Sequence, residues 1–184
     1  FAALFSFTGF SQANIAAARA MGVGSTVTIT GIVTNGDELG PIRYIEDVTG
    51  GIALYDQVLG AVVRGEEVTV TGVLVDYNGL MEMTPVNSLT INSAGNSVTP
   101  QVVTPLQVGE NTEGELIQID NVLFNNGGSL FTVGTHDFDS NGETGKIYIK
   151  AGSPLEMKEE ELLEPDVVNK TKYADSKFLV FYSA

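Results

Sequence analysis

The chain has 184 residues, of which 43% are hydrophobic, so it can bury a core and is not globally disordered. Its net charge is −14, with 9 basic residues against 23 acidic ones, and this field repels polyanions and disfavours non-specific binding to nucleic acid. The lack of cysteine excludes disulfides, zinc–thiolate sites and thiol catalysis. The 21 glycines favour many short strands joined by tight turns, as in a barrel or a sandwich.

The first segment, residues 1–11 (FAALFSFTGFS), is apolar and uncharged. It is too short to span a bilayer as a helix, which takes about 20 apolar residues, and we expect no membrane span. The small residues Gly9 and Ser11 fit a cleavage site, so we interpret the segment as the remnant of a signal peptide. The alternative is an apolar strand or helix of the mature domain. The alanine-rich residues 12–24 predict a short helical lead-in.

The next part of the chain, residues 25–100, alternates apolar and polar residues with period two, which predicts β-strands. Turns are expected at residues 49–51 and at Asn78-Gly79, and a short turn or helical crossover at residues 57–64. The five predicted strands cover residues 25–33, 42–46, 52–55, 66–77 and 80–91, the last interrupted at Pro85.

This order of strands predicts an all-β fold of the oligonucleotide/oligosaccharide-binding (OB) type. Gly31 and Gly72 lie inside the first and fourth strands, where barrel strands commonly bend, and a longer connection joins the third and fourth. We therefore expect residues 25–100 to form an OB-like five-stranded Greek-key barrel.

A second, incomplete OB-like unit is predicted for residues 101–184. Residues 94–105 are rich in Gly, Ser, Thr and Pro and are interpreted as the connection. Behind it, strands are expected at residues 115–124, 130–133, 146–150 and 178–182, with a short helix at residues 154–164. A fifth strand is not evident, so we expect this unit to be truncated.

The strings VTITGIVTNG, IRYIEDVTGGIALYD and RGEEVTVTGVLVDYNGLMEM carry a resemblance to a known group of proteins. Over residues 24–100 the chain resembles OB-type modules of secreted Bacteroidetes proteins. Such modules occur in large cargo of the type IX secretion system, some of which carry extracellular nuclease domains. The leader ending in FSQ is similar to signal peptides of that group. The resemblance implies a secreted or cell-surface protein.

Four residues on the predicted strands are candidates for the ligand face of the barrel, namely Arg43, Tyr44, Tyr55 and Tyr77. Single-stranded nucleic acid is bound on aromatic side chains beside a cationic groove. The aromatic side chains are present, but only Arg43 and Arg64 are basic in the first unit. The alternative is that the tyrosines simply pack the barrel, because aromatic residues are common on strands.

A candidate calcium site lies in the sequence Asp137-Phe-Asp-Ser-Asn-Gly-Glu143. Asp137, Asp139 and Asn141 would supply side-chain oxygens and Glu143 a backbone carbonyl, because loops wrap Ca²⁺ with oxygen ligands at alternate positions. An EF-hand is excluded, since the twelfth position holds Tyr148 in place of a bidentate Glu. The alternative is an exposed hairpin turn at Asn141-Gly142.

Neither the single histidine, His136, nor the glutamates at residues 159–161 form a recognisable catalytic motif. The sequence therefore favours a non-catalytic binding or interaction module of a larger secreted protein, with other domains or surface proteins as its partners. The alternative is a nucleic-acid-binding accessory domain of an extracellular nuclease. That alternative rests on analogy of fold, and the negative charge counts against it.

Overall fold

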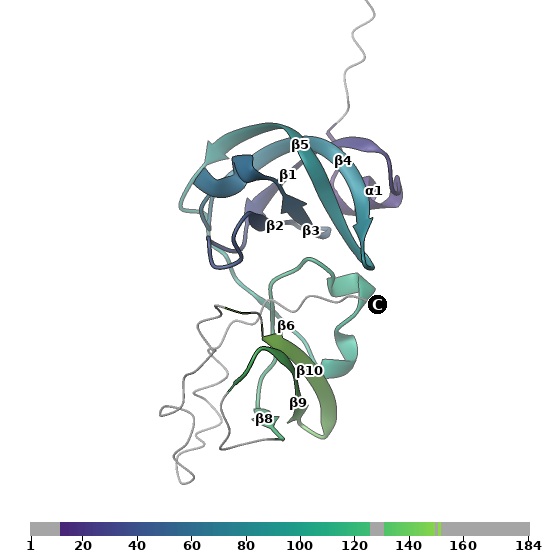
Figure 1. Ribbon diagram of the computed structural model, residues 1–184, viewed down its shortest axis with the longest axis vertical. Helices are drawn as coiled ribbons and strands as arrows, with labels where there is room; N and C mark the ends of the chain where they lie inside the picture. Colours follow the sequence, from purple (N-terminus) through teal and green to yellow (C-terminus); the bar gives the residue numbers. More distant parts are fainter. Residues whose placement is uncertain (1–11, 126–130, 150, 152–184) are drawn as a thin grey trace, which may run out of the picture.

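A computed structural model describes residues 12–125, 131–149 and 151 of the protein. Five strands form a closed barrel in the order β1-β2-β3-β5-β4, which is the strand order of an OB-like barrel and confirms the predicted all-β fold (Figure 1). β1 closes the barrel by pairing antiparallel with β4, and β3 pairs parallel with β5. The barrel strands are β1 (Thr26–Val33), β2 (Ile42–Asp47), β3 (Gly50–Tyr55), β4 (Glu67–Tyr77) and β5 (Leu80–Ser93).

The glycines inside β1 and β4 mark the places where the strands pack too closely for a side chain. A β-carbon on Gly31 would lie 2.9 Å from the Glu46 carbonyl oxygen, and one on Gly72 would lie 2.6 Å from the Pro85 carbonyl oxygen. The β4–β5 register shifts on both sides of Gly72, as expected where a bulge bends a strand. The predicted bend at Gly72 is therefore confirmed, whereas at Gly31 the structure shows a close approach of β2 and an unshifted β1–β4 register.

Two strand boundaries differ from the prediction. The β2–β3 turn consists of Val48 and Thr49, and the two following glycines belong to β3. β5 is continuous through Pro85, where an interruption was expected. Proline is tolerated there because the strand is bulged at this point and needs no regular ladder bond from it.

One end of the barrel is closed by the helix α1 (Ile15–Ala20), which the alanine-rich lead-in predicted. Asn14 caps this helix by accepting a hydrogen bond from the Ala17 amide, and the Ile15 amide donates to Asp47 of β2 over 2.8 Å. Ile15 and Ala18 are fully buried. They pack in one core with apolar residues of the barrel: Val27, Ile29, Val33, Ile45, Ile52, Leu54, Leu59, Val62, Val68, Val70, Leu74 and Met83.

The region after the barrel has its own apolar core, made of Val103, Ile117, Ile119, Val122, Phe131, Phe138, Ile147 and Ile149. This core shares no residue with the barrel core. The region contains β6 (Gln101–Val102), β7 (Ile117–Gln118), β8 (Val122–Phe124), β9 (Gly134–Ser140) and β10 (Glu143–Ile149). β6 pairs parallel with β7, and β8, β9 and β10 form an antiparallel sheet.

The described 3-10 turns of the chain are η1 (Gln57–Ala61), η2 (Pro105–Gln107) and η3 (Glu110–Thr112).

Several predictions for this region need correction. Residues 115–124 form two short strands in place of one, because Asn121 adopts a positive φ of 55° that breaks the extended run. Residues 131–133 are not a strand, and β6 lies inside the predicted connection. The predicted signal peptide (residues 1–11), helix (residues 154–164) and strand (residues 178–182) lie outside the described residues. That residues 101–184 form a second OB-like unit stays a prediction.

Candidate functional site

The structure buries Arg43, one of the residues predicted to face a ligand. Only 1% of it is exposed, and it points into the end of the barrel on the same side as Leu54. Its guanidinium donates hydrogen bonds to the carbonyl oxygens of Val62, Gly40 and Ile42 over 2.7–2.9 Å. A guanidinium engaged in this way is not available to a phosphate, so the prediction for Arg43 is wrong.

Tyr44 lies on the outer side of the barrel, opposite Ala53, but it too is only 1% exposed. Burial, and then the nearby charges of Glu82 and Glu113, raise the pKa of Tyr44 far above its usual value. A ring covered in this way cannot stack on a base, so the prediction for Tyr44 is also wrong.

The other two predicted ligand residues are exposed. Tyr55 ends β3 with 44% of its surface exposed, and Tyr77 ends β4 with 63% exposed. Tyr77 precedes the predicted turn at Asn78-Gly79, where both residues have positive φ (54° and 91°). These tyrosines are free to contact a ligand, but the arginine that was expected beside them is inside the barrel.

OB barrels bind their ligands on the outer surface of strands 2 and 3. Here the chain itself covers this surface of β2 and β3 and the adjoining part of β5. Residues 112–116 (TEGEL), which we name the covering segment, lie across this face. Gly114 approaches Gly51 of β3 so closely that a β-carbon on Gly51 would lie 2.3 Å from the Gly114 carbonyl oxygen. Gly114 has a φ of +77°, which side-chain-bearing residues rarely adopt.

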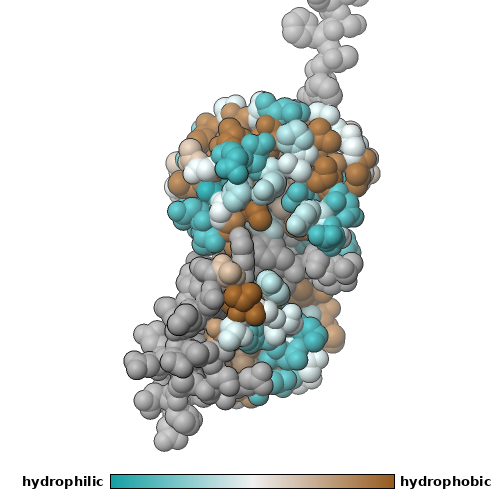
Figure 2. Space-filling view, viewed as in Figure 1, coloured by the Kyte–Doolittle hydropathy of each residue, from teal (hydrophilic) through white to brown (hydrophobic). Residues whose placement is uncertain are grey.

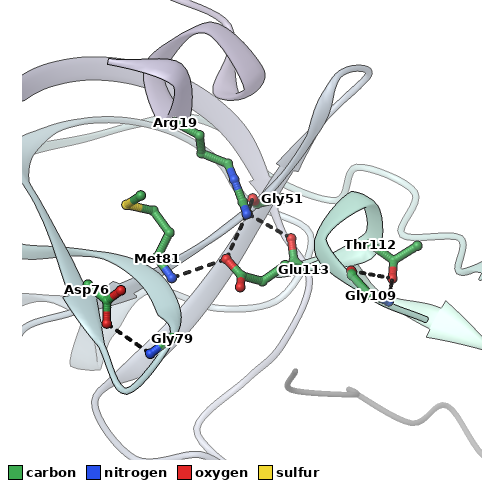
Figure 3. A network of polar contacts seen from close by, with 8 residues as sticks. All are labelled: Arg19, Gly51, Asp76, Gly79, Met81, Gly109, Thr112 and Glu113. Atoms are coloured by element: carbon green, nitrogen blue, oxygen red, sulfur yellow. Dashed lines mark hydrogen bonds and ion pairs between the residues drawn. The ribbon is translucent and has the colours of Figure 1, made fainter. Parts of the chain in front are cut away.

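An ion pair fixes the covering segment to the barrel. Arg19 of α1 donates to Oε1 of Glu113 over 2.7 Å, and the same guanidinium bonds the carbonyl oxygens of Glu113 and Gly51 over 3.0 and 2.8 Å (Figure 3). The amide of Met81 on β5 donates to Oε1 of Glu113 over 3.1 Å. Three separate parts of the chain thus meet at a single carboxyl group.

Further carboxyl groups gather on the covered face. Glu46 of β2 accepts a hydrogen bond from the Leu116 amide, and Glu82 of β5 is 6% exposed. Burial raises the pKa of Glu82, Glu113 and Glu115, and burial together with the charge of Glu115 raises the pKa of Glu46 to about 7.

The sequence contained two signals of this site that the pattern analysis missed. The first signal is Glu82, which lies between two methionines on a barrel strand, where a buried charge needs a partner. The second is Gly51, a residue without a side chain at a position inside β3. Neither signal identifies the covering segment, because Glu113 is 94 residues from Arg19 along the chain.

The predicted calcium ligands lie on a β-hairpin. Asp137 and Asp139 are on β9, and Asp137 forms an exposed ion pair with Lys146 over 2.8 Å. Asn141 has a φ of 50° and forms the turn with Gly142. Glu143 starts β10 and accepts a hydrogen bond from the Leu106 amide over 3.2 Å.

The predicted ligands are spread along the hairpin. Asp137 and Asp139 lie on one face of it, and the Asp137 carboxylate is already paired with Lys146. Within the described residues, no three His, Cys, Asp or Glu side chains are placed to hold a metal ion. The exposed hairpin turn that was the alternative is present at Asn141-Gly142, and calcium binding by these residues stays a prediction.

The visible face of the barrel carries hydrophobic side chains interspersed with hydrophilic ones (Figure 2).

His136, the single histidine, contacts the Thr132 carbonyl oxygen over 2.7 Å and the ring of Phe131. No helix within the described part of the chain combines the length and the apolar character needed to cross a membrane.

Comparison with known proteins gives little beyond this geometry. No family model matches the chain, and no curated protein matches it. A similar solved structure is that of the hypothetical protein ygiW from E. coli, at 17% sequence identity and a TM-score of 0.37. The match covers 44% of this chain and 89% of the E. coli chain. At this TM-score the likeness carries no argument about fold or function, and the description of the barrel rests on its own strand order.

Proposed function

We propose that this chain is a non-catalytic interaction module of a larger secreted or cell-surface protein. In this proposal the OB-like barrel uses its ligand face to hold the chain's own following region. The observation that carries it is the covering segment, whose Glu113 occupies the niche formed by the Arg19 guanidinium and the Met81 amide. A barrel that binds a segment of its own chain in this place acts as a joint between structural units.

The burial of the polar groups supports a non-catalytic role. Glu82 and Glu113, the two most buried carboxyl groups of the face, are 6% and 2% exposed, so a substrate in solution cannot reach them. A general acid or base must come within hydrogen-bond reach of the reacting group. While the covering segment is in place, these groups are enclosed between the segment and the barrel.

Secretion rests on the resemblance of residues 1–11 and 24–100 to secreted Bacteroidetes modules. A direct test is to express the chain, with its leader, in a Bacteroidetes host and to sequence the N-terminus of the protein recovered from the medium. Cleavage after Ser11 gives Gln12 as the first residue. Protein that stays in the cells with its leader intact would contradict the proposal.

The alternative function, binding of single-stranded nucleic acid, draws support from the exposed Tyr55 and Tyr77. Against it, the basic residues of the barrel are Arg19, Arg43 and Arg64, of which the first is ion-paired and the second is buried. Binding to single strands depends on a cationic groove as well as on aromatic rings.

Fluorescence anisotropy with a labelled single strand, at about 50 and about 200 mM salt, separates the two functions. We expect no binding at either concentration. Binding that weakens steeply with salt, and that is lost in the Tyr77→Ala variant, would overturn the proposal in favour of the alternative. Incubation of the strand with the protein and divalent metal, followed by gel analysis, tests for hydrolysis, and we expect the strand to stay intact.

A further inference from the structure

The covered face of the barrel concentrates acidic groups around very little positive charge. Glu46 and Glu82 come from the barrel, while Glu113 and Glu115 come from the covering segment. Arg19 is the guanidinium bonded inside this group. Glu110 of η3 raises the pKa of Glu113, and Arg64 lowers that of Glu46. Tyr44 of β2 is a further titratable group beside the cluster, and its own pKa is raised by burial and then by Glu82 and Glu113.

The two oxygens of Glu113 have different surroundings, and only those of Oε2 suit a proton. Its side chain is 1% exposed. Oε1 accepts hydrogen bonds from Arg19 and from the Met81 amide, whereas Oε2 is buried without a hydrogen-bond partner among the described residues. A buried anionic oxygen without a donor is costly, and a proton on this oxygen removes the charge.

We propose that the covered face is a proton-operated latch, in which the carboxyl cluster takes up protons on mild acidification and then holds the covering segment more tightly on the barrel. The proposal goes beyond the joint described above, because it adds a condition under which the joint tightens or loosens. Its basis is geometric: four carboxyl groups are brought together when the segment docks, and release of the segment returns them to water.

The direction follows from proton linkage. Burial raises the pKa of these groups in the docked state, so the docked state binds more protons than the released state. The resulting stabilisation is fully present below the ordinary carboxyl pKa of 4.5 and is lost as the pH rises through about 7, the pKa of Glu46 in the docked state. The latch is therefore tight in mild acid and weaker at and above neutral pH.

Amide hydrogen exchange of the full chain, followed by NMR, tests the latch. Met81 and Leu116 are the reporters because their amides donate to Glu113 and Glu46 across the junction. After correction for the intrinsic exchange rate, we expect protection at about pH 5 to exceed that at about pH 8 by more than about tenfold. The Val70 amide inside the barrel reports whether the barrel itself stays folded.

Glu46→Gln removes one titrating group, and we expect it to flatten most of the pH dependence of protection at Leu116. Glu67→Gln, on β4, is the matched control, since it changes the net charge equally and should leave the dependence intact. Equal protection at both pH values in the wild type, or an unchanged dependence in Glu46→Gln, would overturn the latch. If the amides of Met81 and Leu116 are unprotected at both pH values while that of Val70 is protected, the covering segment is not docked, and the proposed function is contradicted as well.

Glu113→Gln provides an independent measurement in case Glu46→Gln alters the fold of the barrel. Its amide keeps the shape of the side chain but cannot titrate, so protection at Met81 should depend less on pH than in the wild type, while the part that Glu46 supplies remains. Carbon-13 NMR of the side-chain carboxyl groups gives a direct readout, and we expect the Glu46 signal to titrate near pH 7. Titration of Glu46 at its ordinary value near 4.5 would contradict the proposal.

Discussion

The backbones of Gly51 and Gly114 touch, so that a β-carbon on Gly51 would lie 2.3 Å from the Gly114 carbonyl oxygen and 2.7 Å from the Glu115 amide nitrogen. Such a contact involves backbone atoms on both sides, which cannot rotate away as the end of a side chain can. The two glycines therefore set how closely the covering segment can approach the barrel.

Gly51→Ala should push the covering segment off β3 while leaving the barrel folded. We expect a loss of about 1–3 kcal/mol in the stability of the docked region, the usual cost of forcing extra volume into a packed site. Urea denaturation, together with hydrogen exchange at Leu116, measures it. Gly60→Ala is the control, because its β-carbon would meet nothing within 4 Å, and we expect a change below about 0.5 kcal/mol. Equal effects of the two substitutions would contradict the proposed contact.

The same glycine illustrates what the sequence could and could not predict. The alternation in β1 and the Asn78-Gly79 turn are local patterns, and both were predicted correctly from neighbouring residues. The local sequence places Gly51 in a turn, because nothing near it shows that a segment distant in the sequence packs on it. Its place in the strand becomes understandable only when Gly114 is known to lie against it.

The failed prediction of the ligand face has a related cause. Period-two alternation identifies the side of a strand on which a residue lies, but not what covers that side. Tyr44 was placed on the outer face, and its partner Ala53 is consistent with that, yet it is 1% exposed, and Glu113 of the covering segment is close enough to raise its pKa. Arg43 is a polar residue on the inner side, which an alternation of apolar and polar residues cannot anticipate. The outcome for Tyr44 depends on a segment distant in the sequence, whereas Arg43 bonds carbonyl oxygens only 1, 3 and 19 residues away.

Two ion pairs of nearly equal length should differ widely in their contribution to stability. Arg19–Glu113 spans 2.7 Å with side chains 18% and 1% exposed, whereas Lys146–Asp137 spans 2.8 Å with side chains 73% and 57% exposed. Arg19→Met leaves a buried carboxyl group without its cation, and we expect it to cost about 1–3 kcal/mol in urea denaturation at neutral pH.

Lys146→Met is the matched control for Arg19→Met. It breaks an exposed pair, in which water and salt replace the lost interaction, so we expect a cost below about 1 kcal/mol. A cost for Lys146→Met as large as that for Arg19→Met would show that burial does not distinguish the two pairs. In that case the attachment of the covering segment through Glu113 would need another explanation.

Arg43→Lys should destabilise the barrel without changing any affinity for nucleic acid. The planar guanidinium reaches the carbonyl oxygens of Val62, Gly40 and Ile42, and a lysine ammonium cannot reproduce this arrangement. We expect a loss of about 1–3 kcal/mol in the free energy of unfolding. Arg64→Lys changes an exposed residue and should stay within about 0.5 kcal/mol. A variant of Arg43 that keeps full stability but alters the anisotropy of a labelled single strand would restore this residue to the ligand face.

Calcium should leave the melting temperature of the protein unchanged. A site with a dissociation constant of about 10 μM would add about 2.7 kcal/mol at about 1 mM Ca²⁺, because a ligand that binds only the folded state stabilises it. Asp137 is paired with Lys146, and no three His, Cys, Asp or Glu side chains of the described residues are placed to hold a metal ion, so we expect no such site on the hairpin as it is folded. Thermal unfolding with Ca²⁺ and with chelator measures the difference. A rise in melting temperature that disappears in Asp139→Asn would mean that the turn at Asn141 rearranges around the ion.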